Sequence, residues 1–286
     1  MDLDAFFASC EQLAHPEYRG LPVVVGARPG HRGVVAAASY EARRFGIHSA
    51  MPIAEALRRC PDAVFLPPDM QKYQRQSRQV FQILETLAPV VEAASIDEAY
   101  LDLSGLEKLL GTPAAIGHEI KQRILDETGL TASVGIGPNR LIAKLGSEHR
   151  KPDGLTVVFP EQVLDFLAPM PVANLRGLGR QTQKVFSRLG ISTVQQLRTF
   201  PLPLLEQQLG KKAAASFRRQ ALGIAPDQVL PGQRRKSISK EITFEKDICD
   251  NTRLHDALRG LAADVARTAR REGLSGTIVT LNIRFA

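Results

Sequence analysis

The chain has 286 residues, of which 44% are hydrophobic, and a formal net charge of +7. This length and composition indicate a soluble globular protein with two or more domains, each able to form its own core. No apolar run reaches the length of a membrane span and no signal-peptide pattern begins the chain, so we expect a cytoplasmic protein without a membrane partner. The three cysteines lie far apart, which argues for reduced thiols and against a disulfide framework or a paired-cysteine zinc site.

Two short acidic clusters, Asp2-Leu3-Asp4 and Ser95-Ile96-Asp97-Glu98, stand against apolar neighbours on both sides. Carboxylates held in such surroundings need a counter-cation. Oxygen donors without nearby Cys or His suit Mg²⁺ or Mn²⁺, and two such ions about 3.5–4 Å apart support in-line displacement at phosphorus. The clusters therefore predict phosphoryl or nucleotidyl transfer. Spacing alone could pair Asp2 with Asp4, but Asp4 precedes a helical run, and we favour a role as its N-cap.

The first half of the chain alternates predicted strands and helices. Apolar runs bounded by Gly and Pro predict strands at 23–26 and 33–38, after which a polar stretch begins at Tyr40. Further along, the patterns predict a helix over 70–87, a strand pair over 90–103, a helix through 116–124, a strand at 131–136 and a helix at 139–149 before the turn 151–154. That order indicates a ferredoxin-like core.

Beyond Pro160 the pattern changes to short helices with glycine breaks. The segment 175–182 resembles a helix-hairpin-helix, whose glycines and following helix N-terminus can hold a DNA phosphate, although Gly-x-Gly is also an ordinary turn. Residues 209–212 are a weaker second instance. Residues 159–286 carry 20 Lys and Arg against 11 Asp and Glu, whereas residues 1–158 carry 17 against 19. The excess positive charge of residues 159–286 suits binding to a phosphate backbone. The alternative interpretation is an ordinary solvated basic surface.

A basic hinge at 231–236 precedes the last segment. There the sequence predicts a strand at 237–244, a long helix at 252–272 and a strand at 277–285. Strand, helix and strand make about half of an α/β domain.

Four blocks in order resemble the Y-family DNA polymerases, the translesion group, and within it the bacterial DNA polymerase IV branch. The blocks are residues 2–9, 37–52, 95–102, and 134–137 followed by Lys144 and 151–154. The resemblance covers the whole chain and implies an α+β fold shaped as a right-hand polymerase. It would have a ferredoxin-like palm (1–4 and 71–158), small fingers (5–70), a helical helix-hairpin-helix thumb (159–230), a linker (231–236) and a truncated α/β little finger (237–286).

The resemblance also implies a site. The catalytic carboxylates would be Asp2, Asp97 and Glu98, which with the main-chain carbonyl of Leu3 would hold two Mg²⁺, with Mn²⁺ able to substitute. Nucleotide-binding residues would be Phe6, Phe7, Tyr40, Arg43 and Lys151, with Phe7 as a steric gate against the ribose 2′-hydroxyl. Residues that would bind DNA are Gly177, Gly179, Arg180, Lys184, Arg234, Arg235 and Lys236.

The expected partners are primer–template DNA, a dNTP and, for a full-length protein, a sliding clamp, with the chain itself a monomer. Only Met1 precedes Asp2, where family members carry several apolar residues, so we expect an incomplete first strand. The clamp-binding peptide expected at the C-terminus of such proteins is not in this chain. Two alternatives stay open: a catalytically impaired DNA-binding relative, and a metal-dependent nucleotidyl cyclase, which can share the core and the paired carboxylates.

Overall fold

The computed structural model describes residues 1–106, 108, 111–232 and 235–284. The chain forms two compact units. The first contains Met1–Leu13 and Met70–Pro231, and the second contains Ala14–Asp69 and Gly232–Ala286. Within the described ranges, no helix is both apolar and long enough to cross a membrane.

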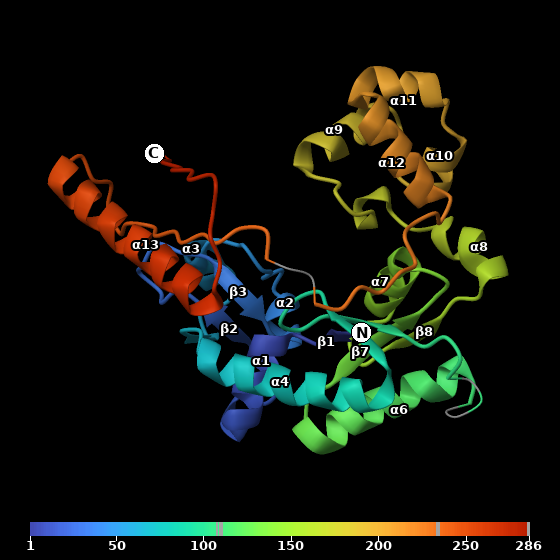
Figure 1. Cartoon of the computed structure of the whole chain (residues 1–286), viewed down its shortest axis with the longest axis horizontal. Helices are drawn as coiled ribbons and strands as arrows, with labels where there is room; N and C mark the ends of the chain where they lie inside the picture. Colours follow the sequence, from blue (N-terminus) through green and yellow to red (C-terminus); the bar gives the residue numbers. More distant parts are fainter. Residues whose placement is uncertain (107, 109–110, 233–234, 285–286) are drawn as a thin grey trace. The chain divides into compact units, whose positions relative to one another are not determined.

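The first unit is built on a mixed sheet (Figure 1). Strand β1 (Asp2–Leu3) pairs antiparallel with β7 (Ala132–Ile136), which pairs parallel with β8 (Leu155–Val157), and β5 (Val90–Ala93) pairs antiparallel with β6 (Ala99–Asp102). Strand β1 joins β6 through a bridge between Asp2 and Glu98 and a bond from the Leu3 N–H to the Asp97 carbonyl, 3.0 Å. The strand order is therefore β5-β6-β1-β7-β8.

Two long helices pack against this sheet. Helix α4 (Met70–Leu87) comes after β1, α1 and the inserted residues 14–69 of the second unit, and it precedes β5. Helix α6 (Pro113–Thr128) lies between β6 and β7 in the chain. Helix α6 buries Ile116, Ile120 and Ile124, one turn apart, and the Thr112 side chain caps its first turn. The order β1-α4-β5-β6-α6-β7, with β1 and β7 adjacent, is the ferredoxin-like arrangement, and this prediction is confirmed.

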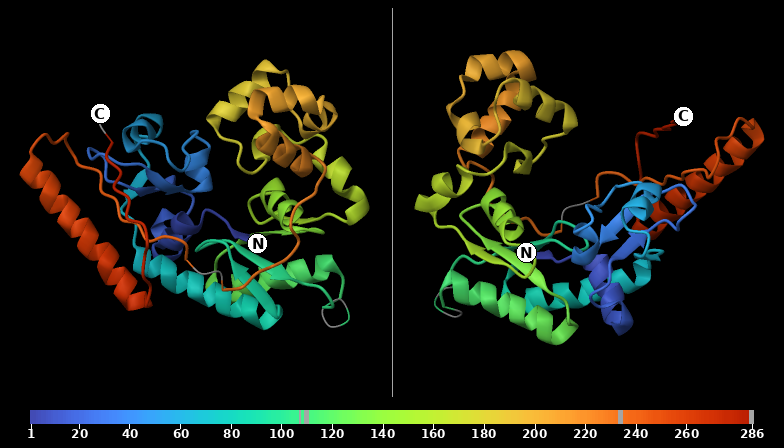
Figure 2. Two further views of the ribbon diagram at one scale, coloured as in Figure 1. Left: turned by 45° about the horizontal axis from the view of Figure 1, so that its top comes forward. Right: turned by 180° about the vertical axis from the view of Figure 1, so that it is seen from behind.

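Helix α7 (Arg140–His149) links the sheet to the helical part of the first unit. The Asn139 side chain accepts hydrogen bonds from the Leu141 and Ile142 N–H groups and so starts the helix, as predicted. Leu141, Ile142 and Leu145 then join one hydrophobic core with the helices that follow. These helices, grouped above the sheet in Figure 2, are α8 (Val163–Leu167), α9 (Arg180–Arg188), α10 (Val194–Thr199), α11 (Leu202–Leu209) and α12 (Lys211–Ala221).

The second unit contains a three-stranded sheet in the order β3-β2-β4. Strands β2 (Val23–Gly26) and β3 (Val35–Ala38) lie in the two predicted segments, whereas β4 (Val64–Leu66) was not anticipated. The helices of this unit are α2 (Tyr40–Arg43), α3 (Ile53–Arg59) and α13 (Asn251–Glu272), the last confirming the prediction at 252–272. Helix α1 (Phe6–Ala14) belongs to the first unit except for its last residue.

The predicted strands at 237–244 and 277–285 are wrong over their described residues. Both segments are irregular, and neither pairs with any strand in the described parts of the chain. Ile278 and Val279 are 84% and 99% exposed. An alternating apolar pattern favours a strand, but a strand exists only where a neighbour completes its hydrogen-bond ladder.

Candidate active site

Asp2 on β1 and Glu98, the residue directly before β6, lie side by side at the centre of the first unit's sheet. Their backbones form the bridge between β1 and β6, and the Ala99 N–H donates to the Met1 carbonyl at 3.1 Å. Asp2 is only 6% exposed. The fold therefore brings together two carboxylates that are far apart in the sequence.

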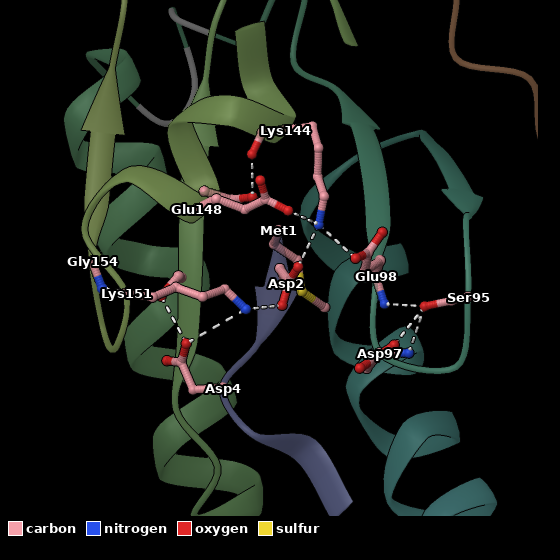
Figure 3. A network of polar contacts seen from close by, with 12 residues as sticks. Met1, Asp2, Asp4, Ser95, Asp97, Glu98, Lys144, Glu148, Lys151 and Gly154 are labelled. Atoms are coloured by element: carbon pink, nitrogen blue, oxygen red, sulfur yellow. Dashed lines mark hydrogen bonds and ion pairs between the residues drawn. The ribbon is translucent and has the colours of Figure 1, made fainter. Parts of the chain in front are cut away.

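Two lysine side chains meet this pair (Figure 3). The Lys144 ammonium lies 2.6 Å from Asp2 Oδ2 and 2.5 Å from Glu98 Oε1, and it also contacts Glu148 at 3.0 Å. Lys151 contacts the other carboxylate oxygen of Asp2. Lys144 is on α7, which packs against β7, and its bridging contact was not predicted because only the tertiary fold joins these segments.

The surroundings push the pKa values of the two carboxyls in opposite directions. Burial alone would raise the pKa of Asp2, but the nearby charge of Lys151 and hydrogen bonds from Lys144 and Lys151 more than offset it, so the pKa is lowered. Burial raises the pKa of Glu98, and the contact with Lys144 only partly compensates. Lys144 itself has a raised pKa: its contacts with Asp2 and Glu98 outweigh the effect of burial. The pair is thus a site of negative charge that requires a cationic partner.

Asp97 is held differently from Asp2 and Glu98. Ser95 Oγ donates to Asp97 Oδ1 at 2.5 Å and accepts from the N–H groups of Asp97 and Glu98, which makes a tight turn before β6. Across the described ranges no three acidic, His or Cys side chains lie close enough to form a metal-binding group. The structure therefore joins Asp2, Glu98 and the Asp97 backbone, while the Asp97 carboxylate is turned to Ser95.

The donor set nevertheless fits a hard divalent cation. Asp2 and Glu98 present carboxylate oxygens, and their present partners are ammonium groups, so the position already favours positive charge. Asp4 has another task. It is buried, its two oxygens accept from Ser133 Oγ and from the Asp153 N–H, each at 2.8 Å, and these bonds tie β1 to β7 and to the turn at 151–154. The N-cap role of Asp4 stays a prediction.

The two phenylalanines at the start of α1 have different surroundings. Phe6 is buried, at 3% exposure, and Phe7 is half-buried. The ring of Phe7 stacks on Tyr73 of α4, whose hydroxyl donates to the buried carboxylate of Glu11 at 2.7 Å. Tyr73 and Glu11 were not predicted as part of the site, because each reads as an ordinary helix residue.

Tyr40 and Arg43 belong to the second unit, on α2. The Arg43 guanidinium lies over the Tyr40 ring, 4.6 Å from its centroid, and Arg43 Nε donates to the Ala38 carbonyl at 3.0 Å. Their expected contact with a triphosphate stays a prediction.

The predicted hairpin is present before α9. Gly177 has φ +80°, which a residue with a side chain rarely adopts, and Gly179 is the N-cap of α9. No heavy atom within the described chain lies within 4 Å of a Cβ added at either glycine. Arg180 and Lys184 are exposed on α9. In the linker, Arg235 pairs with Glu272 at 3.3 Å and Lys236 is exposed, while Arg234 lies outside the described residues.

A ferredoxin-like sheet with paired carboxylates, followed by a basic helical half, defines the class of palm-containing nucleotidyl transferases. The model of the impB/mucB/samB family matches residues 1–148, and that of the family's C-terminal domain matches 235–286. DNA polymerase IV of Alkalilimnicola ehrlichii is 44% identical over 285 residues, covering 100% of this chain and 80% of that protein. DNA polymerase IV of Halorhodospira halophila is 45% identical over 286 residues, with the same coverage.

Solved structures agree with these relatives. A Y-family DNA polymerase chimera of Dbh and Dpo4 superposes with a TM-score of 0.83 at 31% identity, covering 93% of this chain and 78% of the other. DinB from Sulfolobus solfataricus gives 0.72 at 34% identity, covering 80% and 68%. An insertion ternary complex of Dbh DNA polymerase gives 0.71 at 34% identity, covering 80% and 67%. The chain belongs to the impB/mucB/samB family, the Y-family DNA polymerases, which confirms the resemblance predicted from the sequence.

Proposed function

We propose that the protein is a template-directed, low-fidelity DNA polymerase that adds a dNTP to a primer 3′-hydroxyl and extends across damaged templates. The observation that carries this proposal is the backbone bridge between Asp2 on β1 and Glu98 directly before β6 of the ferredoxin-like sheet, in a chain whose matched relatives are named DNA polymerase IV. Primer–template DNA and a dNTP are the substrates.

The carboxylates Asp2, Asp97 and Glu98, with the Leu3 carbonyl, would hold the two Mg²⁺ ions. The chemistry that such a pair supplies is a lowered pKa at the primer hydroxyl and neutralisation of charge as pyrophosphate leaves. The protein's own part is positioning. The backbone bridge holds Asp2 and Glu98 side by side, and a rotation of Asp97 away from Ser95 would add the third carboxylate.

Nucleotide recognition follows from cationic and aromatic side chains. Tyr40, Arg43 and Lys151 would contact the triphosphate oxygens, for which a guanidinium fork and an ammonium are suited. Phe6 would lie beside the triphosphate. Phe7 would exclude the ribose 2′-hydroxyl by its volume, and the stack on Tyr73 supports this assignment because it limits the motion of the ring.

DNA would be held by the hairpin glycines 177 and 179, by Arg180 and Lys184, and by the linker cations Arg234, Arg235 and Lys236. The open space around both glycines supports close approach of a phosphate to the backbone. In this scheme residues 1–4 and 71–158 are the palm, 5–70 the fingers, 159–230 the thumb, 231–236 the linker and 237–286 part of the little finger.

Primer extension tests the proposal directly. The chain is incubated with dNTPs and a primer on an intact template or on one with an abasic site, with Mg²⁺ or with a chelator. We expect Mg²⁺-dependent extension on both templates and its loss in Asp97→Ala. DNA binding without extension would instead identify an impaired relative. A cyclic product formed from a single nucleotide without DNA would identify a cyclase.

A further inference from the structure

Glu92 on β5 is a buried carboxylate outside the proposed active site. It is 6% exposed, and its two oxygens have different partners. Oε1 accepts from Arg140 Nη2 at 2.6 Å, and Oε2 accepts from the Leu230 N–H at 2.8 Å. A buried carboxylate is costly unless it is paired and hydrogen-bonded, so these two bonds are what allow Glu92 to occupy this position.

The bond to Leu230 is one of a series along residues 223–230, which we name the exit strap because they follow α12. Asn139 Nδ2 donates to the Gly223 carbonyl at 2.8 Å, and Arg140 donates from its N–H to the Pro226 carbonyl and from Nη1 to the Gln228 carbonyl, each at 3.4 Å. The Arg140 guanidinium also lies 4.4 Å from the centre of the Tyr100 ring on β6. The exit strap is therefore fastened at four points to the sheet and to the start of α7.

Helix α7 connects this anchor with the active site and the helical part. Arg140 is its first residue, and Lys144, about one turn later, contacts Asp2 and Glu98. Its apolar face belongs to the same core as α8 to α12. Through Arg140, Glu92 thus holds the start of α7, the helix that contacts the active-site carboxylates and packs in the core of the helical part. Through Leu230 it also holds the segment that leaves the helical part.

We propose that Glu92 is a positioning residue that fixes the end of the exit strap to the sheet and thereby sets where the basic linker begins. Glu92 would then affect the affinity for DNA and not the rate of the chemical step. This inference rests on the DNA binding in the proposed function. The strap ends at Leu230, directly before the linker at 231–236 that carries the cations. Losing the Glu92 bond releases residues 229–230, and losing the Arg140 contact with Gln228 as well releases 227–230. The connection to the following domain would then grow from about six to about eight or ten residues, and the effective concentration of that domain would fall about 1.5- to twofold.

The test uses the whole chain and the variants Glu92→Gln, which keeps the shape and an acceptor but removes the charge, and Glu92→Ala, which removes both. Leu230→Pro removes the N–H donor, together with the leucine side chain, and leaves the Glu92–Arg140 pair intact, so it serves if the Glu92 variants fold poorly. Glu127→Gln is the matched control, because Glu127 forms an exposed ion pair with Arg123 on α6 at 2.9 Å and does not touch the strap.

Three measurements are made: hydrogen–deuterium exchange over residues 223–230, the Kd for a primer–template duplex, and the single-turnover rate on saturating DNA. We expect faster exchange in the strap and a Kd raised about 1.5- to twofold in the three strap variants, with the saturated rate close to that of the parent and the control unchanged. The proposal is overturned if strap exchange is unaltered, if exchange rises while Kd does not, or if the loss appears in the saturated rate. Failure of the parent to extend primers would reject the proposed function alone, since exchange and Kd still decide the role of Glu92.

Discussion

The aromatic rings of Phe7 and Tyr73 stack with their centroids 4.1 Å apart and their planes 12° from parallel. Tyr73 is fully buried, and its hydroxyl donates to Glu11, which also pairs with Lys72 at 2.7 Å. Helix α4 therefore holds the ring of Phe7 from one side.

Replacing Phe7 should relax the selection of the sugar. In Phe7→Ala the volume proposed to meet a 2′-hydroxyl is gone, and we expect the ratio of ribonucleotide to deoxyribonucleotide incorporation to rise by about two orders of magnitude. Single-nucleotide insertion kinetics with matched rNTP and dNTP measure it. Tyr73→Phe keeps the stack and should retain the parent's selectivity. An unchanged ratio in Phe7→Ala would show that Phe7 is not the gate.

Replacing Lys144 should destabilise the fold. In Lys144→Met, Asp2 and Glu98 lose the ammonium that bridges them, and we expect the free energy of unfolding in chelator to fall by about 3 kcal/mol. Urea denaturation measures this, and Mg²⁺ should recover part of the loss, since a divalent cation supplies the missing charge. Lys212→Met, on the exposed surface of α12, should change stability by less than about 0.5 kcal/mol. Equal effects of the two substitutions would contradict the assignment.

The two hairpin glycines should respond differently to alanine. At Gly177, with φ +80°, alanine should cost about 1 kcal/mol of stability and weaken DNA binding. At Gly179 the backbone is extended, with φ −83°, and open space surrounds the added methyl, so stability should change by only a few tenths of a kcal/mol. DNA affinity should nevertheless fall if a phosphate approaches this turn. Thermal melts and fluorescence anisotropy separate the effects, and unaltered affinity in Gly179→Ala would argue against the turn as a DNA contact.

One of the three thiols should react rapidly in the native chain. Cys249 is exposed, whereas Cys10 and Cys60 are buried. Burial, with repulsion from Glu11, raises the pKa of Cys10 to about 12. A colorimetric thiol reagent at pH 8 should therefore titrate one thiol quickly and all three after unfolding. Fast reaction of two or more native thiols would contradict this burial.

The same shift predicts a pH dependence. Because the pKa of Cys10 is higher in the folded chain than in the unfolded one, the unfolded chain loses this proton first. The stability that the protonated thiol contributes is complete below the ordinary thiol pKa and is lost as the pH rises towards 12. Denaturation curves of the parent should show this decline, and Cys10→Ala should lack that part of it.

Several features could be read from local sequence because local contacts create them. Helix α6 follows from its Ile spacing, the start of α7 from Asn139, and the hairpin turn from its glycines. The family resemblance, carried by short blocks in a fixed order, likewise needed no coordinates. The predictions at 237–244 and 277–285 were wrong over the described residues because a strand forms only beside a pairing partner. The residues of one segment do not reveal whether such a partner is present.

By itself the sequence determined the class of fold, the family and the acidic residues of the candidate site, because helix periodicity, turn chemistry and motif order are properties of neighbouring residues. Only the tertiary structure decided that Lys144 bridges Asp2 and Glu98 and that Glu92 fastens the exit strap. Each of these contacts joins segments whose approach is paid for by the burial of a whole core, so no local pattern encodes it.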